Sequence, residues 1–422
     1  MKVLIKQARI ICASSPFNGQ SKDILVTDGI IRNISDSINE QADEVISFNN
    51  LHVSIGWMDG FAHFCDPGFE YRETLETGAN AAIAGGFTDV MLMPDTHPVI
   101  DNKSQVAYII QQSKSLPITI YPIAAATKNA EGKELAEMYD MQQSGAIAFG
   151  DGMKAIENSG MLIKALQYVK VFNGTIIQTP DDRNIAANGL MNEGIVSTQL
   201  GLPGKPAMAE DLMVTRDIEL TCYAESKLHF SAISTAKSLE AIRYAKAGGI
   251  KITCSVTPFH LFFCDEDLRT YDTNLKVNPP LRTKFDRAAL IKGLQDGTID
   301  SIASQHIPQN YDGKICEFEY AKSGMIGLES LFGVTGTLLS NEWSIEQLIE
   351  KLSVATRKIF NLPIPEIKVG AVACLTIFDP ELEYTFDETM IASKSKNSAF
   401  TGKKLKGKVL GIFNKNQLIL NK

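Results

Sequence analysis

The chain has 422 residues, of which 44% are apolar and 21% are charged, and its formal net charge is -8. This length suits one large domain with an appendage, and the composition is that of a globular protein. Acidic and basic residues are interspersed, and no stretch approaches the ~18 consecutive apolar residues of a membrane helix. We therefore expect neither nucleic acid nor a membrane as a partner.

The seven cysteines are an odd number, and none are spaced as C-x-x-C. This pattern favours reduced thiols over a disulfide framework or a zinc knuckle. The apolar stretch at the N-terminus is only a few residues long and predicts no signal peptide. We therefore expect a cytoplasmic protein.

Both ends of the chain are predicted to be rich in β-strands. Apolar runs separated by polar turns occur at 3–5, 8–11, 23–26, 29–34, 373–378 and 407–413. Asp28-Gly29 is a hairpin signal between two of them. We therefore predict that residues 1–53 and 361–422 come together as one small β-rich domain.

Residues 54–360 alternate short apolar runs with helical patterns. The runs lie at 90–93, 118–123, 146–149, 174–177, 227–230, 250–254 and 299–303. Helical patterns, such as those at 159–171 and 238–247, lie between them. This alternation is typical of parallel βα units, and seven or eight of them suit a (β/α)8 barrel better than an open sheet. In such a barrel the functional residues lie just after the strands.

Several motifs resemble those of dihydroorotases, zinc enzymes of the amidohydrolase superfamily that interconvert N-carbamoyl-aspartate and dihydroorotate. They lie in the family's order at 56–68, 73–78, 84–88, 93–96, 276–282, 296–300, 324–329, 393–397 and 402–407. Each match is weak by itself, but the series is specific. The chain is therefore identified as a divergent member of this family of cyclic amidohydrolases.

The resemblance implies a binuclear zinc centre, but its ligands are largely replaced in this chain. The family builds the centre from a D-x-H-x-H motif, a bridging Asp or modified Lys, two further His, and an Asp that is also the general base. These positions correspond here to Phe61, His63, Asp151, Thr179, Ala232 and, for the catalytic Asp, Gln305. A hydrolytic zinc usually needs three protein ligands and an open position. With only His63 and Asp151 left as vestigial ligands, we expect no metal, no cofactor and no functional catalytic residue.

The positions that hold the substrate carboxylate in the family are also altered. The family uses an Arg, an Asn and a His, which are here Cys65, Asp95 and Gln309, while Asn278 is retained from the other substrate contacts. Cys cannot replace the bidentate fork of Arg. A carboxylate at position 95 would repel a substrate carboxylate ~4 Å away by about 4 kcal/mol at an effective dielectric constant near 20.

Some of these residues allow a second interpretation. His63 and Asp151 could still bind a metal, although hydrogen bonding within the barrel is the simpler role. Cys65 beside His63 could be a thiolate nucleophile, but buried free cysteines are common. Asp181 and Asp182 could form an acid/base pair, yet we favour a helix cap for this segment.

Loss of metal ligands, base and carboxylate clamp together favours a non-catalytic protein of pyrimidine biosynthesis with a structural or regulatory role. The resemblance makes aspartate transcarbamoylase the first partner to test, and we expect a homo-oligomer, most simply a dimer. The alternative is an active cyclic amidohydrolase with a rearranged site, acting on dihydroorotate or a related ureide.

Overall fold

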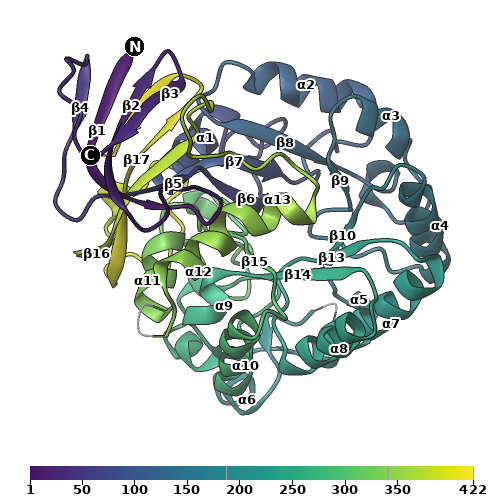
Figure 1. Cartoon of the computed structure of the whole chain (residues 1–422). Helices are drawn as coiled ribbons and strands as arrows, with labels where there is room; N and C mark the ends of the chain where they lie inside the picture. Colours follow the sequence, from purple (N-terminus) through teal and green to yellow (C-terminus); the bar gives the residue numbers. More distant parts are fainter. Residues whose placement is uncertain (187, 340–341, 422) are drawn as a thin grey trace.

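Eight parallel strands form a nearly closed barrel in the computed structural model, which describes residues 1–186, 188–339 and 342–421 (Figure 1). In sheet order they are β6 (Trp57–Ala62), β7 (Phe87–Leu92), β8 (Thr119–Ala124), β9 (Ala148–Phe149), β10 (Ile176–Gln178), β13 (Leu228–Phe230), β14 (Ile252–Val256) and β15 (Ser301–Ile302). The segment after β15 returns to β6 through a bridge between His306 and Ala62, and His63 N–H donates to the His306 carbonyl over 2.8 Å. This arrangement confirms the predicted (β/α)8 barrel.

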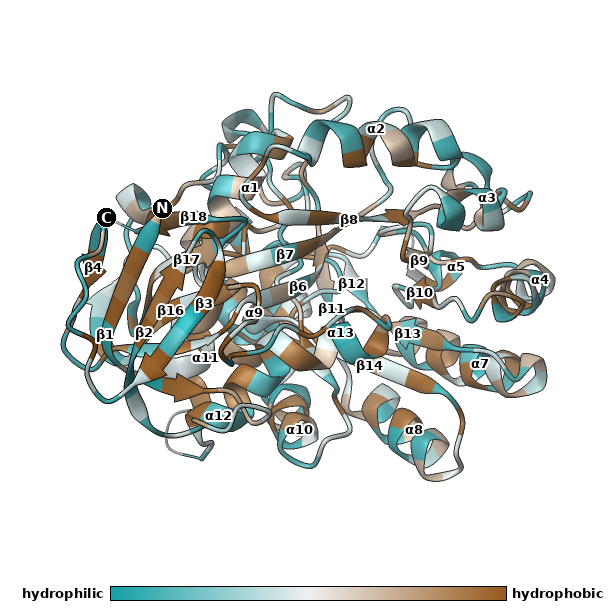
Figure 2. Cartoon of the chain, turned by 45° about the horizontal axis from the view of Figure 1, so that its top comes forward, coloured by the Kyte–Doolittle hydropathy of each residue, from teal (hydrophilic) through white to brown (hydrophobic). Residues whose placement is uncertain are grey.

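Helices cover the outside of the barrel. The longer ones are α1 (Leu75–Ala84), α2 (Lys103–Ser113), α4 (Ser159–Lys170), α7 (Met208–Ala224), α8 (Ala236–Ala247), α10 (Lys284–Gln295) and α11 (Leu331–Leu339). The shorter ones are α3 (Met138–Gln143), α5 (Arg183–Ala186), α6 (Ile195–Leu200), α9 (Pro258–Phe262), α12 (Ile345–Ile349) and α13 (Ala355–Ile359). Many begin at a side chain that accepts a backbone N–H of the first turn, as Thr74 does for α1 and Asn158 for α4. The helices alternate teal polar faces with brown apolar ones in Figure 2, as expected for helices with one buried face.

Both ends of the chain pair into one sheet beside the barrel, at the upper left of Figure 1. Its order is β18 (Gln417–Leu420), β17 (Lys404–Asn414), β16 (Leu375–Thr385), β5 (His52–Ile55), β1 (Lys2–Ile11), β2 (Ser21–Thr27) and β3 (Ile30–Ser35), and β4 (Glu44–Ile46) also pairs with β1. The central contact is antiparallel, between β5 and β16. This sheet confirms the prediction that the two β-rich ends meet.

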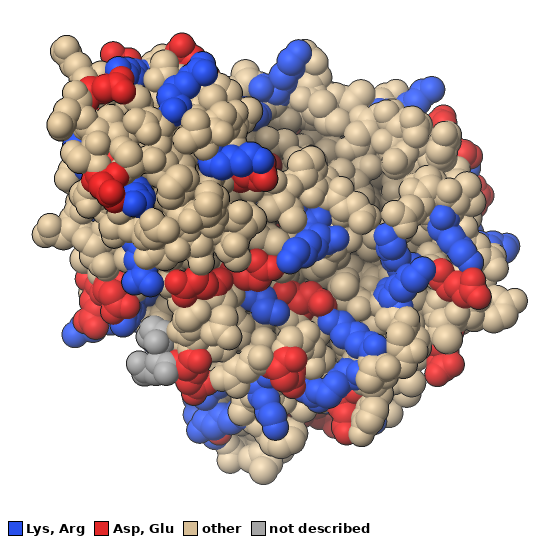
Figure 3. Space-filling model, viewed as in Figure 1, with Lys and Arg blue, Asp and Glu red and all other residues tan. Residues whose placement is uncertain are grey.

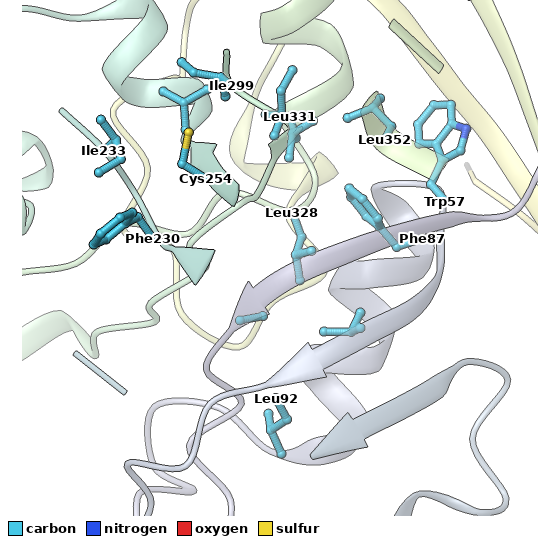
Figure 4. Close-up of a cluster of buried hydrophobic side chains, with 14 of the residues drawn as sticks. Trp57, Phe87, Leu92, Phe230, Ile233, Cys254, Ile299, Leu328, Leu331 and Leu352 are labelled. Carbon is cyan, nitrogen blue, oxygen red and sulfur yellow. The ribbon is translucent and has the colours of Figure 1, made fainter. Parts of the chain in front are cut away.

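The barrel and the terminal sheet share one apolar core. Trp57 at the start of β6 packs its ring against Phe332 of α11, with centroids 4.7 Å apart, and against Phe378 of β16, with centroids 5.5 Å apart. Val409 and Ile412 of β17 belong to the same buried cluster. Figure 4 shows part of it, with Phe87 beside Trp57. The terminal sheet is thus held by packing as well as by hydrogen bonds.

A second apolar cluster involves the barrel strands themselves. It contains Met58 and Phe61 of β6, Met91 of β7, Ile177 of β10 and Phe360, all buried. The inside of the barrel is therefore a packed core, as in other barrels of this type.

Charged side chains of both signs lie on the surface. Acidic and basic side chains are intermixed on the face in Figure 3. Within the described ranges, no helix is both long enough and apolar enough to cross a bilayer.

Candidate functional site

A cavity of about 480 Å³ opens at the carboxyl ends of the barrel strands. This volume is that of a site for a small metabolite, and the position is where barrels of this type carry their functional residues. Predicted site residues that line it are His63, Asp95, Asn278 and Gln309. The others, Phe61, Cys65, Asp151, Thr179, Ala232 and Gln305, are buried and do not line it.

Both ring nitrogens of His63 are used within the protein. Nδ1 accepts the backbone N–H of Cys65 over 2.9 Å, so the proton is on Nε2, which donates to the Asp95 backbone carbonyl over 3.0 Å. Burial lowers the pKa of His63, against the raising effect of the Asp95 carboxylate. His63 is therefore a neutral side chain that joins the ends of β6 and β7.

Asp151, which the motifs predict to be the bridging ligand, binds the loop after β8. One carboxylate oxygen accepts the backbone N–H groups of Ala126 and Thr127 over 3.1 and 3.0 Å, and the other accepts the Thr127 hydroxyl. Burial raises the pKa of Asp151 although these hydrogen bonds act to lower it. Both carboxylate oxygens thus already accept hydrogen bonds from the loop after β8.

The other residues that the motifs place at the metal positions are Phe61, Thr179, Ala232 and Gln305. Phe61 and Ala232 have no donor atom, and the Thr179 hydroxyl donates to the Gly152 carbonyl over 3.0 Å. Gln305 donates from Nε2 to the Asn278 carbonyl over 3.2 Å. Phe61 also lies in the apolar cluster of the barrel interior, where a divalent cation is poorly solvated. These side chains do not fit the family's binuclear zinc centre.

Asp95 turns its carboxylate toward the segment after β9. Oδ2 accepts the Met153 N–H over 3.0 Å, and Oδ1 is buried without a hydrogen-bond partner among the described residues. A Cβ at Gly152 would lie 2.3 Å from that Oδ1, so the turn closes directly over the carboxylate. The Asp95 carboxylate thus faces the Gly152–Met153 turn. Whether it repels a substrate carboxylate stays a prediction.

Lys205 is a cavity residue that the motifs did not reveal. It lies in β12 (Gly204–Lys205), which pairs with β11 (Met191–Asn192) in a separate two-stranded sheet. Its Nζ donates to Asp181 Oδ2 over 2.6 Å and to Asn278 Oδ1 over 2.9 Å. Burial lowers the pKa of Lys205, and the Asp181 carboxylate opposes this. No family motif contains Lys205, so only the fold shows its contact with the retained Asn278.

The structure also bears on the alternative roles of Cys65 and Asp182. Burial raises the pKa of the Cys65 thiol to about 12, so it is not a thiolate nucleophile at neutral pH. Asp182 accepts the Asn184 N–H over 2.9 Å at the start of α5, which confirms the helix cap.

Gln309, at a predicted substrate position, donates from its side-chain amide to the Ser323 carbonyl over 2.8 Å.

Comparisons with known proteins agree with the motifs. The family model described as dihydro-orotase-like matches residues 52–238. The dihydroorotase of Syntrophus aciditrophicus (strain SB) is 38% identical over 414 residues, which is 97% of each chain. That of Ruminiclostridium cellulolyticum is 40% identical over 410 residues, or 96% of each chain.

The chain belongs to the dihydroorotase family. The family identified from the motifs is thereby confirmed. Among solved structures, the L-hydantoinase of Arthrobacter aurescens has the same fold, with a TM-score of 0.86 at 23% identity over 100% of this chain and 96% of that one. The comparisons give no sign of a non-catalytic role, and the names of the dihydroorotase relatives agree better with the alternative of an active enzyme.

Proposed function

We propose that this dihydroorotase-family chain acts in pyrimidine biosynthesis as a non-catalytic, structural or regulatory protein of the cytoplasm. The observation that supports this most directly is the state of the metal positions. Phe61 and Ala232 offer no ligand atom, and His63 and Asp151 already accept hydrogen bonds from backbone N–H and hydroxyl donors. Zinc bound at these atoms would compete with those hydrogen bonds.

A second candidate is an active cyclic amidohydrolase with a rearranged site. The observation that favours it is the identity of 38–40% to dihydroorotases over nearly the whole chain. Such an enzyme would have to use the polar groups that remain at the cavity, among them Lys205 and Asp181.

The deciding experiment measures metal content and turnover in the same preparation. The purified chain is incubated with zinc, its bound metal is measured by mass spectrometry, and both hydrolysis of dihydroorotate and cyclisation of N-carbamoyl-aspartate are followed. We expect no stoichiometric zinc and no turnover, with the Syntrophus aciditrophicus relative as positive control. Near-stoichiometric zinc together with a kcat on the order of 1 s⁻¹ or more would establish the second candidate.

We also propose aspartate transcarbamoylase as a partner and a homodimer as the state of the free chain. Light scattering after size-exclusion chromatography tests both proposals. A dimer is expected alone, and a larger complex is expected after mixing with the aspartate transcarbamoylase of the same organism. A monomer, or no complex at micromolar concentrations, would reject the respective proposal.

A further inference from the structure

Arg72 is a charged residue of the cavity that uses few of its hydrogen-bond donors. It lies in the loop before α1 and lines the cavity with His63 and Asn278. Its Nε donates to the Tyr71 hydroxyl over 3.2 Å. Across residues 1–186, 188–339 and 342–421, its two Nη groups have no acceptor and no ion-pair partner.

Two aromatic rings lie close to the Arg72 guanidinium. Its central carbon lies 4.3 Å from the centroid of the Phe69 ring and 5.3 Å from that of Tyr71. Phe69 also lines the cavity. A stacked guanidinium keeps its planar edge free to form two parallel hydrogen bonds with a carboxylate.

The acidic neighbours of Arg72 are occupied elsewhere. Glu70 accepts the Gly68 N–H over 2.7 Å. Glu73 is fully buried and accepts hydrogen bonds from Thr77, Ser393 and the Lys394 N–H. The positive charge of Arg72 at the cavity is therefore not cancelled by an ion pair.

Arg72 shares the cavity with two positions that the family uses to bind the substrate carboxylate. Asp95 and Gln309, which the motifs place at those positions, line the same cavity.

We propose that Arg72 replaces the lost Arg as the anchor of a small carboxylate ligand, so that the cavity binds carboxylates without any metal. The ligand class is a small metabolite with one carboxylate, received by the free edge of the stacked guanidinium. This inference rests on the proposed function, because it describes a site that binds and does not turn over its ligand.

The test measures binding to protein treated with EDTA, with two probes that differ only in the carboxylate. Dihydroorotate has the carboxylate and 5,6-dihydrouracil lacks it. By isothermal titration calorimetry, we expect dihydroorotate to bind at least tenfold more tightly than dihydrouracil. Equal affinities, or no binding of dihydroorotate, would overturn the proposal.

Variants assign the effect to Arg72. We expect Arg72→Met to weaken dihydroorotate binding by about tenfold to a hundredfold, the range for a charge-assisted hydrogen-bonded pair, with no change for dihydrouracil. Arg72→Lys keeps the positive charge but not the two parallel N–H donors of the guanidinium. Its affinity for dihydroorotate should lie between those of the wild type and of Arg72→Met. Arg32→Met is the matched control, because Arg32 is exposed on β3 and does not line the cavity. Wild-type affinity in Arg72→Met would refute the role of this residue.

The two proposals fail in different measurements. Turnover of dihydroorotate by the zinc-treated chain refutes the non-catalytic role, and the effect of Arg72→Met would then appear as a raised KM. If dihydroorotate binds equally well to the wild type and to Arg72→Met in EDTA, only the proposed role of Arg72 is refuted.

Discussion

At the scale of single residues, the side chains that the motifs place at the family's metal positions make contacts that support the fold. Asp151 is the clearest example, because its carboxylate satisfies two backbone N–H groups and one hydroxyl at the end of β8. A metal ligand that loses its metal becomes an unpaired buried charge, whereas Asp151 is paired by the fold itself. This difference can be measured.

We predict that Asp151→Ala lowers the free energy of unfolding by about 2–4 kcal/mol, because buried N–H groups lose their acceptor. EDTA should leave the melting temperature of the wild-type chain unchanged. Differential scanning fluorimetry compares the effects of Asp151→Ala and of EDTA on the melting temperature. Asp312→Ala is the control, since Asp312 is exposed. An EDTA effect as large as that of the substitution would show instead that Asp151 holds a metal.

The replaced base gives a second prediction at this scale. Gln305→Asp alone should give no hydrolysis of dihydroorotate, because a general base contributes only ~10²–10⁴-fold and needs a bound nucleophile to act on. Adding Phe61→His, Thr179→His and Ala232→His should restore zinc binding before turnover, since residues that act as a unit are strongly non-additive.

Zinc content and dihydroorotate hydrolysis, measured at each step of that series, check the order of recovery. The full series also needs the carboxylate clamp, Cys65→Arg, Asp95→Asn and Gln309→His. Enzyme-like turnover by Gln305→Asp alone would contradict the view that the ligand set is lost.

At the scale of elements, α7 is attached to the barrel through a buried charge. Asp217 of α7 accepts the side-chain amide of Gln178, on β10, over 3.0 Å and pairs with Arg216 at 2.6 Å. Gln178 in turn accepts the Ile156 N–H over 3.0 Å. Burial nevertheless raises the pKa of Asp217 to about 6.

This shift predicts how stability depends on pH. A carboxyl whose folded pKa lies above its unfolded value stabilises the fold below about pH 4, and this contribution is lost as the pH rises through about 6. Relative to Asp217→Asn, the wild-type chain should therefore lose up to about 3 kcal/mol between pH 4 and pH 7. Urea unfolding at both pH values measures the difference, and Asp312→Asn should show none. A constant difference would mean that Asp217 does not titrate in this range.

The elements show what a sequence can predict and what it cannot. The apolar runs at 146–149 and 299–303 located β9 and β15, although each strand is only two residues long. Periodicity reports which face is buried, and that is local information. The pairing of Lys205 with Asn278 joins residues 73 positions apart. The cavity lining around Arg72 likewise depends on how distant loops meet. The sequence shows which residue type occupies each position that matches a family motif. It does not show which atoms that residue contacts in the folded chain.

At the scale of the whole molecule, the shared core couples the barrel to the terminal sheet. Trp57 is fully buried between them, against Phe332 and Phe378. Asn414 and Lys415, at the β17–β18 turn, donate to the carbonyls of Pro117 and Ile118 just before β8. The two parts should therefore unfold together.

We predict one cooperative thermal transition. The chain has two tryptophans, so Trp343→Phe leaves Trp57, at the junction, as the only tryptophan, and excitation at about 295 nm reports on it selectively. Its fluorescence midpoint should coincide with that of far-UV circular dichroism, as two-state unfolding requires. Midpoints several degrees apart would show that the sheet and the barrel unfold separately.

The pairing of β5 with β16 also constrains how the chain folds while it is being made. Trp57, next to β5, bonds to a residue 319 positions later, and Ser54 of β5 pairs with Thr376. At about 5–20 residues per second, a ribosome needs roughly 15–65 s to synthesise the segment between them. During that time one edge of β5 is not paired with β16, and Trp57 is not packed against Phe332 and Phe378. Until the last strands emerge, the nascent barrel exposes an unpaired strand edge and apolar surface of the kind that chaperones bind.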